Sequence, residues 1–441
     1  MMQEQRATEY AQRLSRMIQI ETVSERAQQN KEKFYRFHDL LRELFPNLFR
    51  VCSFEDFDGS FLLHWQGQSQ ESPLMLMNHH DVVEAGGNWK YHPFSGKIAE
   101  GKVWGRGTLD TKGGLFCMLQ AADELAAQGF VPAKDVYFVS ACTEESDSEG
   151  AYNISCALKE RNIRFSMVLD EGGMIVRDPI GGAHGTFAMV GLGEKGCADL
   201  RFVARSAGGH ACAPGKNSPL VRLGKFMAAV EKKNNLFLTE VSPIICQTLK
   251  RLSKSMQFPL NFVLGHPVLF KPLLKAVMPG VSGSANAMLK TTLAFTMAGG
   301  SDGANVLPQE AWVVGNMRYS HHQGRDDSID AVRKFAKKFD IEVEVLDAGT
   351  PSPLSKFDSD AYRLVEKAVG HVFSDVTAVP YLMNGASDSR FMSLVCDNCI
   401  RFVPFKITDE QLDSIHGIDE NVDLASLAPA VDFYKYIMTE V

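Results

Sequence analysis

The sequence LMLMNHHDVV covers residues 74–83, and GRGTLDTKGG follows at residues 105–114. The first four apolar residues predict a short strand that is buried on both faces, because no polar side chain interrupts them. His79, His80 and Asp81 come directly after that strand. Strand ends are where an α/β sheet presents its ligand-binding side chains. Imidazole and carboxylate groups together bind zinc-like ions, so the stretch predicts a metal site at the edge of a sheet.

The residues that follow complete a strand-helix-strand pattern. Residues 112–128 carry apolar side chains at helical spacing, and Gly129 marks the expected end of that helix. Residues 136–142 and 167–169 predict two further buried strands. Strands that are apolar on both faces belong to a sheet with helices on both sides. We therefore expect an α/β domain with a mixed, mostly parallel sheet covered by helices.

The pattern changes near residue 195. Alternating strands and two helices are expected at residues 197–206, 219–232, 291–300, 311–320, 328–339 and 341–349. This combination indicates an α+β layer with one solvent-exposed face, of the ferredoxin-like type. A helical pattern then resumes at residues 358–373 and leads to a last strand-like run. We expect one domain formed by residues 1–194 and 351–441, with residues 195–350 inserted as a second domain.

Composition and charge exclude several classes of protein. The chain of 441 residues has 46 Lys and Arg against 53 Asp and Glu, a formal charge of −7, and no run of five like charges. A nucleic-acid partner is therefore not expected. Residues 1–25 lack the apolar core of a signal peptide, so we expect a cytoplasmic protein. Residues 258–280 are the most apolar, but four prolines and two lysines interrupt them. They indicate a groove or interface element and no membrane partner.

Ten short motifs follow one another along the chain: HDVV, GRGTLD, TEES, VLDEGG, EKG, GHACAP, NVLP, NMR, GASDSR and IHGIDE. With these motifs the chain resembles the dizinc peptidase and amidase family that includes aminoacylase, carboxypeptidase G and carboxypeptidase S. The segment FPLNFVLGHPVLFKPLL resembles the carboxypeptidase S and N-acyl amino acid hydrolase branch of that family. The resemblance covers nearly the whole length and implies a catalytic dizinc domain of zinc-peptidase type at residues 1–194 and 351–441, with residues 195–350 as its lid domain. It also implies two bound Zn²⁺ ions, or Co²⁺ or Mn²⁺ in their place.

The first two motifs imply the start of the ligand set. In the family the first motif is His-x-Asp, which implies that His79 and not His80 binds metal. Asp81 would hydrogen-bond the far ring nitrogen of His79 and fix its tautomer, as carboxylates behind a metal ligand commonly do. Asp110 corresponds to the carboxylate that bridges the two metals. The glycines around Asp110 also suggest a phosphate loop, but the GKS or GKT ending that a P-loop requires is missing.

The remaining ligands come from three separate motifs. Glu144 and Glu145 follow a buried strand, where successive side chains point in different directions. By resemblance, Glu144 is the general base, and Glu145 binds the second metal together with His416. Asp170 is the expected terminal ligand of the first metal, with the adjacent Glu171 as the alternative. Two imidazoles and three carboxylates with an open position are typical of a hydrolytic zinc pair.

The motifs also imply substrate contacts. His210 corresponds to a histidine that approaches the scissile carbonyl, in several family members from the partner subunit, which implies a homodimer through the lid. Asn305 and Arg318 correspond to residues that contact substrate, and arginine suits a terminal carboxylate because its fork makes two directed hydrogen bonds. Gly385 corresponds to a backbone position near the same carboxylate.

These residues predict a metal-dependent hydrolase that cleaves an amide bond next to a free carboxylate, in an N-acyl amino acid or a short peptide. The expected catalytic residues are Glu144, Asp81 and His210. The apolar insertion at residues 237–289 either shelters an acyl chain or a hydrophobic side chain, or forms a dimer interface or lid core. Two alternatives are a catalytically silent metal-binding or scaffold protein on the same fold, and a deacetylase of a small biosynthetic metabolite.

Overall fold

The computed structural model describes residues 2–26, 30–232, 235–349 and 351–441. Its largest sheet is built from β1 (Cys52–Phe57), β2 (Ser60–Trp65), β3 (Ser69–Met77), β6 (Lys134–Ser140), β7 (Met167–Asp170), β8 (Ile175–Arg177), β9 (Thr186–Glu194), β16 (Val376–Met383) and β17 (Cys399–Arg401). The strand order is β1-β2-β6-β3-β7-β17-β9-β16, with β8 paired to β9. Strands β6, β3, β7 and β17 run parallel, whereas β1 and β2 at one edge are antiparallel.

Helices cover both faces of this sheet: α1 (Met2–Ile18), α2 (Glu32–Leu44), α3 (Pro46–Val51), α4 (Lys112–Ala127), α5 (Glu149–Glu160), α12 (Asp360–Val372), α13 (Ser389–Met392), α14 (Asp409–Ser414) and α15 (Leu424–Glu440). Strand β3 shows the two faces, because Leu76 packs in a core with Phe116 of α4, whereas Met75 packs in another core with Ile154 of α5. The predicted α/β domain with a mixed sheet is confirmed.

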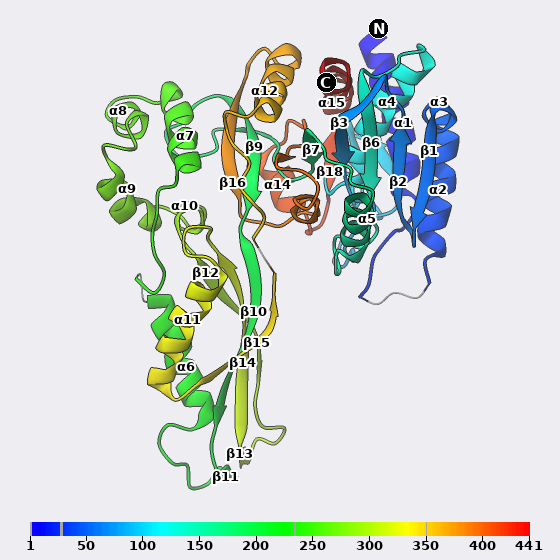
Figure 1. The fold of residues 1–441 in the computed structure, drawn as a ribbon. Coiled ribbons are helices and arrows are strands. Elements are labelled where there is room, and N and C mark those ends of the chain that lie inside the picture. The colour runs from blue at the N-terminus through cyan, green and yellow to red at the C-terminus, as the bar shows by residue number, and fades with distance from the viewer. Residues whose placement is uncertain (1, 27–29, 233–234, 350) are drawn as a thin grey trace.

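The inserted region contains a separate antiparallel sheet in the order β12 (Thr292–Gly299), β14 (Glu310–Tyr319), β10 (Gly196–Arg205) and β15 (Glu342–Ala348). Helices α6 (Pro219–Lys232) and α11 (Arg325–Ala336) bury their apolar faces against it, where Phe202 and Phe226 form the centre of a second core. This is the predicted lid. It extends away from the large sheet and ends in a small pair of strands, β11 (Gly209–His210) and β13 (Val306–Leu307) (Figure 1).

The apolar insertion forms short helices: α7 (Pro243–Leu252), η1 (Ser253–Ser255), α8 (Leu260–Gly265), α9 (Lys271–Val277), η2 (Met278–Gly280) and α10 (Gly283–Leu289). We expected all of residues 195–350 to form the lid, but α7 packs against β16 of the large sheet. Thr248 donates a hydrogen bond to the carbonyl of Pro380, and Arg251 donates to that of Ala378. In the described part of the chain, no helix is long and apolar enough to cross a membrane.

The remaining elements are small. Strands β4 (Lys97–Ala99), β5 (Lys102–Trp104) and β18 (Asn421–Asp423) form a third sheet, and η3 (Lys337–Phe339) continues α11. Pairing of β18 with β5 brings the C-terminal segment back to the loop that precedes Asp110. The two ends of the sequence therefore meet at one side of the large sheet.

Candidate metal centre

The parallel strands of the large sheet bring three of the predicted motifs to one edge. His79 follows β3, the pair Glu144 and Glu145 follows β6, and Asp170 is the last residue of β7. Because β6, β3 and β7 are neighbours and parallel, their carboxyl ends lie side by side. Asp110 reaches this edge from the loop before α4.

Asp110 lies between two histidines from distant parts of the chain. Its Oδ1 is 3.0 Å from Nε2 of His79, and its Oδ2 is 3.0 Å from Nε2 of His416. Nε2 of His416 is also 3.1 Å from Oε2 of Glu145. The ligand atoms of His79, Asp110 and Glu145 all lie within 4.8 Å of one another. One carboxylate oxygen thus faces each imidazole, which is the arrangement that a bridging ligand requires.

His416 has an unusual backbone conformation. It follows α14 with a φ of 58°, in the left-handed region that residues other than glycine seldom adopt. Strained residues of this kind cluster at functional sites, where the surrounding structure holds them in place. The strain is therefore consistent with a ligand role.

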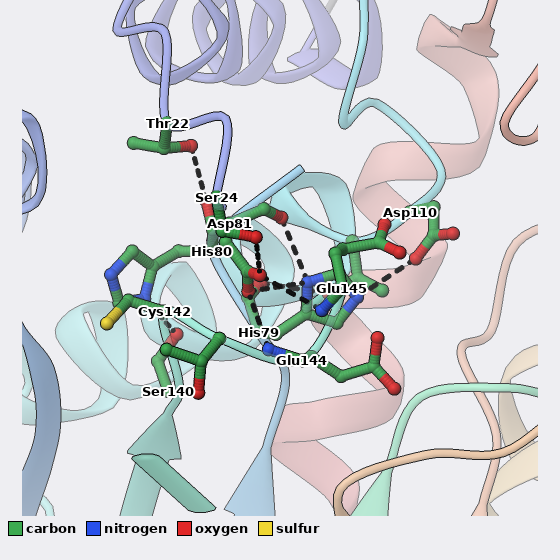
Figure 2. Close-up of polar contacts among 12 residues, drawn as sticks. Thr22, Ser24, His79, His80, Asp81, Asp110, Ser140, Cys142, Glu144 and Glu145 are labelled. Carbon is green, nitrogen blue, oxygen red and sulfur yellow. Dashed lines mark hydrogen bonds and ion pairs between the residues drawn. The ribbon is translucent and has the colours of Figure 1, made fainter. Parts of the chain in front are cut away.

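Asp81 is buried behind His79 and positions several neighbours (Figure 2). Nδ1 of His79 is 2.9 Å from the main-chain oxygen of Asp81 and 3.4 Å from its Oδ1, so the carbonyl makes the shorter contact. The Asp81 carboxylate accepts hydrogen bonds from the backbone N–H groups of Glu144 (3.2 Å) and Glu145 (3.0 Å), and from the Ser24 hydroxyl (2.6 Å). Asp81 therefore orients both the imidazole and the loop of the two glutamates.

His80 points away from the centre into the core. Its Nδ1 is 2.8 Å from the Ser140 hydroxyl, and its ring stacks on Phe37 with 5.2 Å between centroids. Burial lowers the pKa of His80 well below its ordinary value, so the ring is neutral. The two adjacent histidines thus differ in environment, and only His79 faces Asp110.

Carboxylates crowd the centre and perturb one another's pKa values. Burial raises the pKa of Glu144 well above its ordinary value, and the charges of Glu145 and Asp110 raise it further. Burial also raises the pKa of Glu145. Hydrogen bonds to Asp110 and Glu145 raise the pKa of His416 to about 10. Burial thus disfavours the charged form of both glutamates, and divalent cations beside them would favour it.

The spacing of the donors also fits metal. Zinc ligands lie about 2.0–2.2 Å from the ion, so two ligand atoms in a tetrahedral set stand roughly 3.4 Å apart. The 3.0 Å contacts of Asp110 with His79 and His416 would need to lengthen by only about 0.4 Å to hold an ion. The residues present therefore fit a pair of divalent ions.

Two adjacent carboxylates, Asp170 and Glu171, lie at the carboxyl end of β7. Asp170 is buried, and its Oδ2 accepts a hydrogen bond from the backbone N–H of Ser389 at 2.9 Å. Burial raises the pKa of Glu171 well above its ordinary value, and the charges of Asp170 and Asp110 raise it further. Ser389 belongs to the segment after β16 that carries the exposed Gly385, so this segment lies against the metal centre.

A buried ion pair that sequence reasoning missed supports the loop of Asp110. Nη1 of Arg106 donates to Oε2 of Glu420 at 2.7 Å, and the other oxygen of Glu420 accepts from three backbone N–H groups in residues 107–110. Arg106 also donates to the carbonyl of Gly417, next to His416. Both charged residues occur inside the motifs GRGTLD and IHGIDE, which is the signal that could have identified them.

The lid residues are not gathered at the metal centre of the same chain. His210 is exposed on β11, beside Asn305, whose carbonyl accepts a hydrogen bond from the N–H of Ala211 at 2.9 Å. Both lie at the far tip of the lid (Figure 1). Arg318 lies near the other end of β14, where its Nε donates to Asn316 at 3.0 Å. Within a single chain, His210 and Asn305 therefore lie at the opposite end of the lid from Arg318.

Comparisons with known proteins agree with this architecture. The probable carboxypeptidase S-like 2 of Dictyostelium discoideum is 29 % identical over 98 % of this chain and 84 % of its own length. The human N-fatty-acyl-amino acid synthase/hydrolase PM20D1 is 29 % identical over 94 % of this chain and 84 % of its own length.

Solved structures share the fold. An M20 family metallo-carboxypeptidase from Sulfolobus solfataricus has a TM-score of 0.69 at 16 % identity, covering 96 % of this chain and 97 % of its own. Human carnosine dipeptidase 1 has a TM-score of 0.68 at 14 % identity, covering 99 % of this chain and 96 % of its own. The model of peptidase family M20/M25/M40 matches residues 75–440. Because this match spans most of both domains, the chain belongs to peptidase family M20/M25/M40 and is a metal-dependent hydrolase.

Proposed function

We propose that the enzyme hydrolyses the amide bond of N-acyl amino acids at a dinuclear zinc centre. The observation that carries this proposal is the position of Asp110, with one oxygen toward His79 and the other toward His416. PM20D1, 29 % identical along nearly the whole chain, supports N-acyl amino acids as substrates. The probable carboxypeptidase S-like 2 is equally identical and supports short peptides, so the substrate panel below decides between the two classes. The dipeptidase and carboxypeptidase structures share only the fold, at 14–16 % identity.

Five residues would hold the two ions, with Co²⁺ or Mn²⁺ as possible substitutes for Zn²⁺. His79 and Asp170 would bind the first ion, Glu145 and His416 the second, and Asp110 both. Two such ions supply Lewis-acid polarisation of the amide carbonyl and lower the pKa of water from about 15.7 to about 7.

Glu144 is the proposed general base. Its raised pKa suits a group that takes a proton from the attacking water and then passes it to the leaving nitrogen, as the carbon–oxygen bond forms and the carbon–nitrogen bond breaks. Asp81 holds both groups in place, because its carboxylate accepts from the backbone N–H of Glu144 and its main-chain oxygen contacts the ring of His79. Figure 2 shows the side chains of Glu144 and Glu145 diverging from their shared loop.

The lid residues require a second copy of the chain. Because His210 and Asn305 lie at the far tip of the lid, we infer that a partner subunit supplies them in a cytoplasmic homodimer formed through the lid. His210 would donate a hydrogen bond to the oxyanion, and the loss of one such donor typically lowers turnover about 10²- to 10³-fold. Arg318 and the backbone at Gly385 would bind the substrate carboxylate.

Substitution of the two adjacent carboxylates identifies the terminal ligand. We expect Asp170→Asn to lose bound zinc, as the reference variant His79→Ala should, whereas Glu171→Gln retains both ions. The physical reason is that an amide is a much poorer zinc ligand than a carboxylate. Elemental analysis of each purified variant measures the metal content. A full complement in Asp170→Asn together with a deficit in Glu171→Gln would assign the role to Glu171.

Loss of the arginine fork should affect substrates selectively. We expect Arg318→Ala to raise KM for substrates with a free carboxylate and to lower kcat/KM about 10- to 100-fold, the usual scale for a hydrogen bond to a charged group. Analogues whose carboxylate is replaced by an amide should react almost equally with Arg318→Ala and with the unaltered enzyme. Arg325→Ala, which removes an exposed arginine of the same domain, serves as the control. Equal losses on both substrate classes would rule out the carboxylate role of Arg318.

A substrate panel tests the proposed function itself. The zinc-reconstituted enzyme is incubated with N-acyl amino acids of increasing chain length and with dipeptides, and the products are identified by mass. We expect release of the amino acid from N-acyl substrates, loss of activity on chelation, and recovery when zinc returns. Cleavage confined to dipeptides would make the enzyme a dipeptidase. No turnover with full metal occupancy would favour the catalytically silent alternative.

A further inference from the structure

The apolar insertion forms a projecting lobe beside the large sheet. Residues 254–281, here called the outer lobe, include α8 and α9 and lie at the outer edge of the molecule (Figure 1, left). One side of the lobe is anchored, because Leu264 and Leu274 pack into apolar clusters that also contain residues of α7. The rings of Phe262 and Phe270, 5.7 Å apart, join α8 to the start of α9.

The outer lobe also presents large apolar side chains to solvent: Phe258, Phe262, Val268, Leu269, Val277 and Val281. Phe258 is 80 % exposed, Val268 77 %, and Leu269 and Val281 70 % each. In the described part of the chain, no other stretch of this length exposes as many large apolar residues. Single exposed apolar residues are ordinary, whereas a group of them marks an interaction surface.

The charge of this region is opposite to that of the rest of the protein. Residues 243–290 contain six Lys and Arg and no Asp or Glu, which leaves 40 basic against 53 acidic residues elsewhere. Lys250 and Lys254 are exposed, and neither forms an ion pair with a described residue. Lys271 and Lys275 share a single carboxylate, that of Glu240. The outer lobe and its base are therefore both apolar and positively charged.

We propose that the outer lobe docks the enzyme on the surface of an anionic lipid bilayer. Its apolar side chains enter the boundary between headgroups and acyl chains, while Lys250 and Lys254 meet anionic headgroups. A second copy of the chain fits less well, because a twofold contact places the same lysines against each other. The sequence led us to expect no membrane partner because a spanning helix was missing. Docking on the surface does not need one, and it does not depend on the proposed substrate.

Vesicle sedimentation of the full-length protein tests this proposal. We expect binding to vesicles of phosphatidylcholine mixed with phosphatidylglycerol, weaker binding as salt rises, and little binding to phosphatidylcholine alone. Replacing Val268 and Leu269 together by serine should lower the partition coefficient at least about tenfold, because two aliphatic side chains no longer leave water. Replacing Lys250 and Lys254 together by glutamate should remove the preference for the anionic vesicles.

The control is a double serine substitution at another exposed Val-Leu pair, outside the outer lobe. Val345→Ser with Leu346→Ser alters two adjacent exposed aliphatic residues on β15, and this protein should bind vesicles like the unaltered one. Thermal unfolding and light scattering of each variant report folding and mass. Three results would overturn the proposal. The first is no binding of the unaltered protein to anionic vesicles, and the second is equal binding by the double-serine variants at 268–269 and at 345–346. The third is a change in the mass of the particle in solution that occurs only in the 268–269 variant. The last result would identify a second copy as the occupant.

Discussion

Replacement of Glu144 by glutamine is expected to lower kcat by about 10³-fold or more while both metal ions remain bound. Glutamine has nearly the same size as glutamate, but its amide cannot accept a proton from water at neutral pH. The carboxylate of Glu144 is not one of the five proposed metal ligands, so metal binding should survive. Steady-state kinetics on an N-acyl amino acid, with metal content measured on the same sample, checks both halves of this expectation.

Two neighbouring glutamates provide the controls for this variant. Glu145→Gln should lose activity together with metal, because Glu145 lies 3.1 Å from His416 inside the donor cluster. Glu149→Gln changes an exposed residue in the first turn of α5 and should leave both activity and metal content unchanged. If Glu144→Gln keeps substantial turnover, the base is another group. If it loses metal, Glu144 is a ligand and the assignment of the two glutamates must be exchanged.

Local patterns in the sequence were sufficient for much of the fold. The helix expected at residues 219–232 is observed as Pro219–Lys232, and the helix expected at residues 112–128 as Lys112–Ala127. The alternating run at residues 197–206 forms β10 between residues 196 and 205. These elements were predictable because each buries one face or both, and burial imposes a period on the apolar residues.

Edge strands were harder to predict. Strand β1 is partly exposed along its whole length, so its apolar residues follow no clear period, and it was not predicted. Strand β16 contains Pro380, which argues against a strand when only the sequence is known. It is tolerated here because β16 is the last strand of the sheet order.

The ligand motifs were visible in the sequence, but their supporting contacts were not. His79 and Asp81 are two residues apart, and their resemblance to the family's His-x-Asp motif implied a ligand and its orienting carboxylate. Arg106 and Glu420 are 314 residues apart, and no local pattern relates them. In the same way, only the folded chain shows that His210 is exposed at the far tip of the lid, whereas Arg318 lies near the other end of β14.

The Arg106–Glu420 pair leads to the second large expected effect. Glu420→Ala removes the acceptor of Arg106 and of three backbone N–H groups in the loop of Asp110, and all of these groups are buried or partly buried. Breaking a buried ion pair by removing one partner typically costs about 3–5 kcal/mol, because the other charge is left unpaired. We expect the free energy of unfolding in urea to fall by about this amount. Zinc should also bind more weakly, because the backbone that carries Asp110 is no longer held.

A double substitution distinguishes the effect of the lost ion pair from the effect of the lost support for the Asp110 loop. Arg106→Met with Glu420→Ala removes both buried charges, so it should be less destabilised than Glu420→Ala alone, with a coupling that a double-mutant cycle measures. Its zinc affinity should nevertheless stay low, because the three N–H groups of the loop remain without their acceptor in either variant. Glu43→Ala breaks an exposed pair with Arg16 and should leave both quantities unchanged. Recovery of zinc affinity in the double variant would show that the unpaired charge of Arg106, and not the lost support of the Asp110 loop, weakens metal binding in Glu420→Ala.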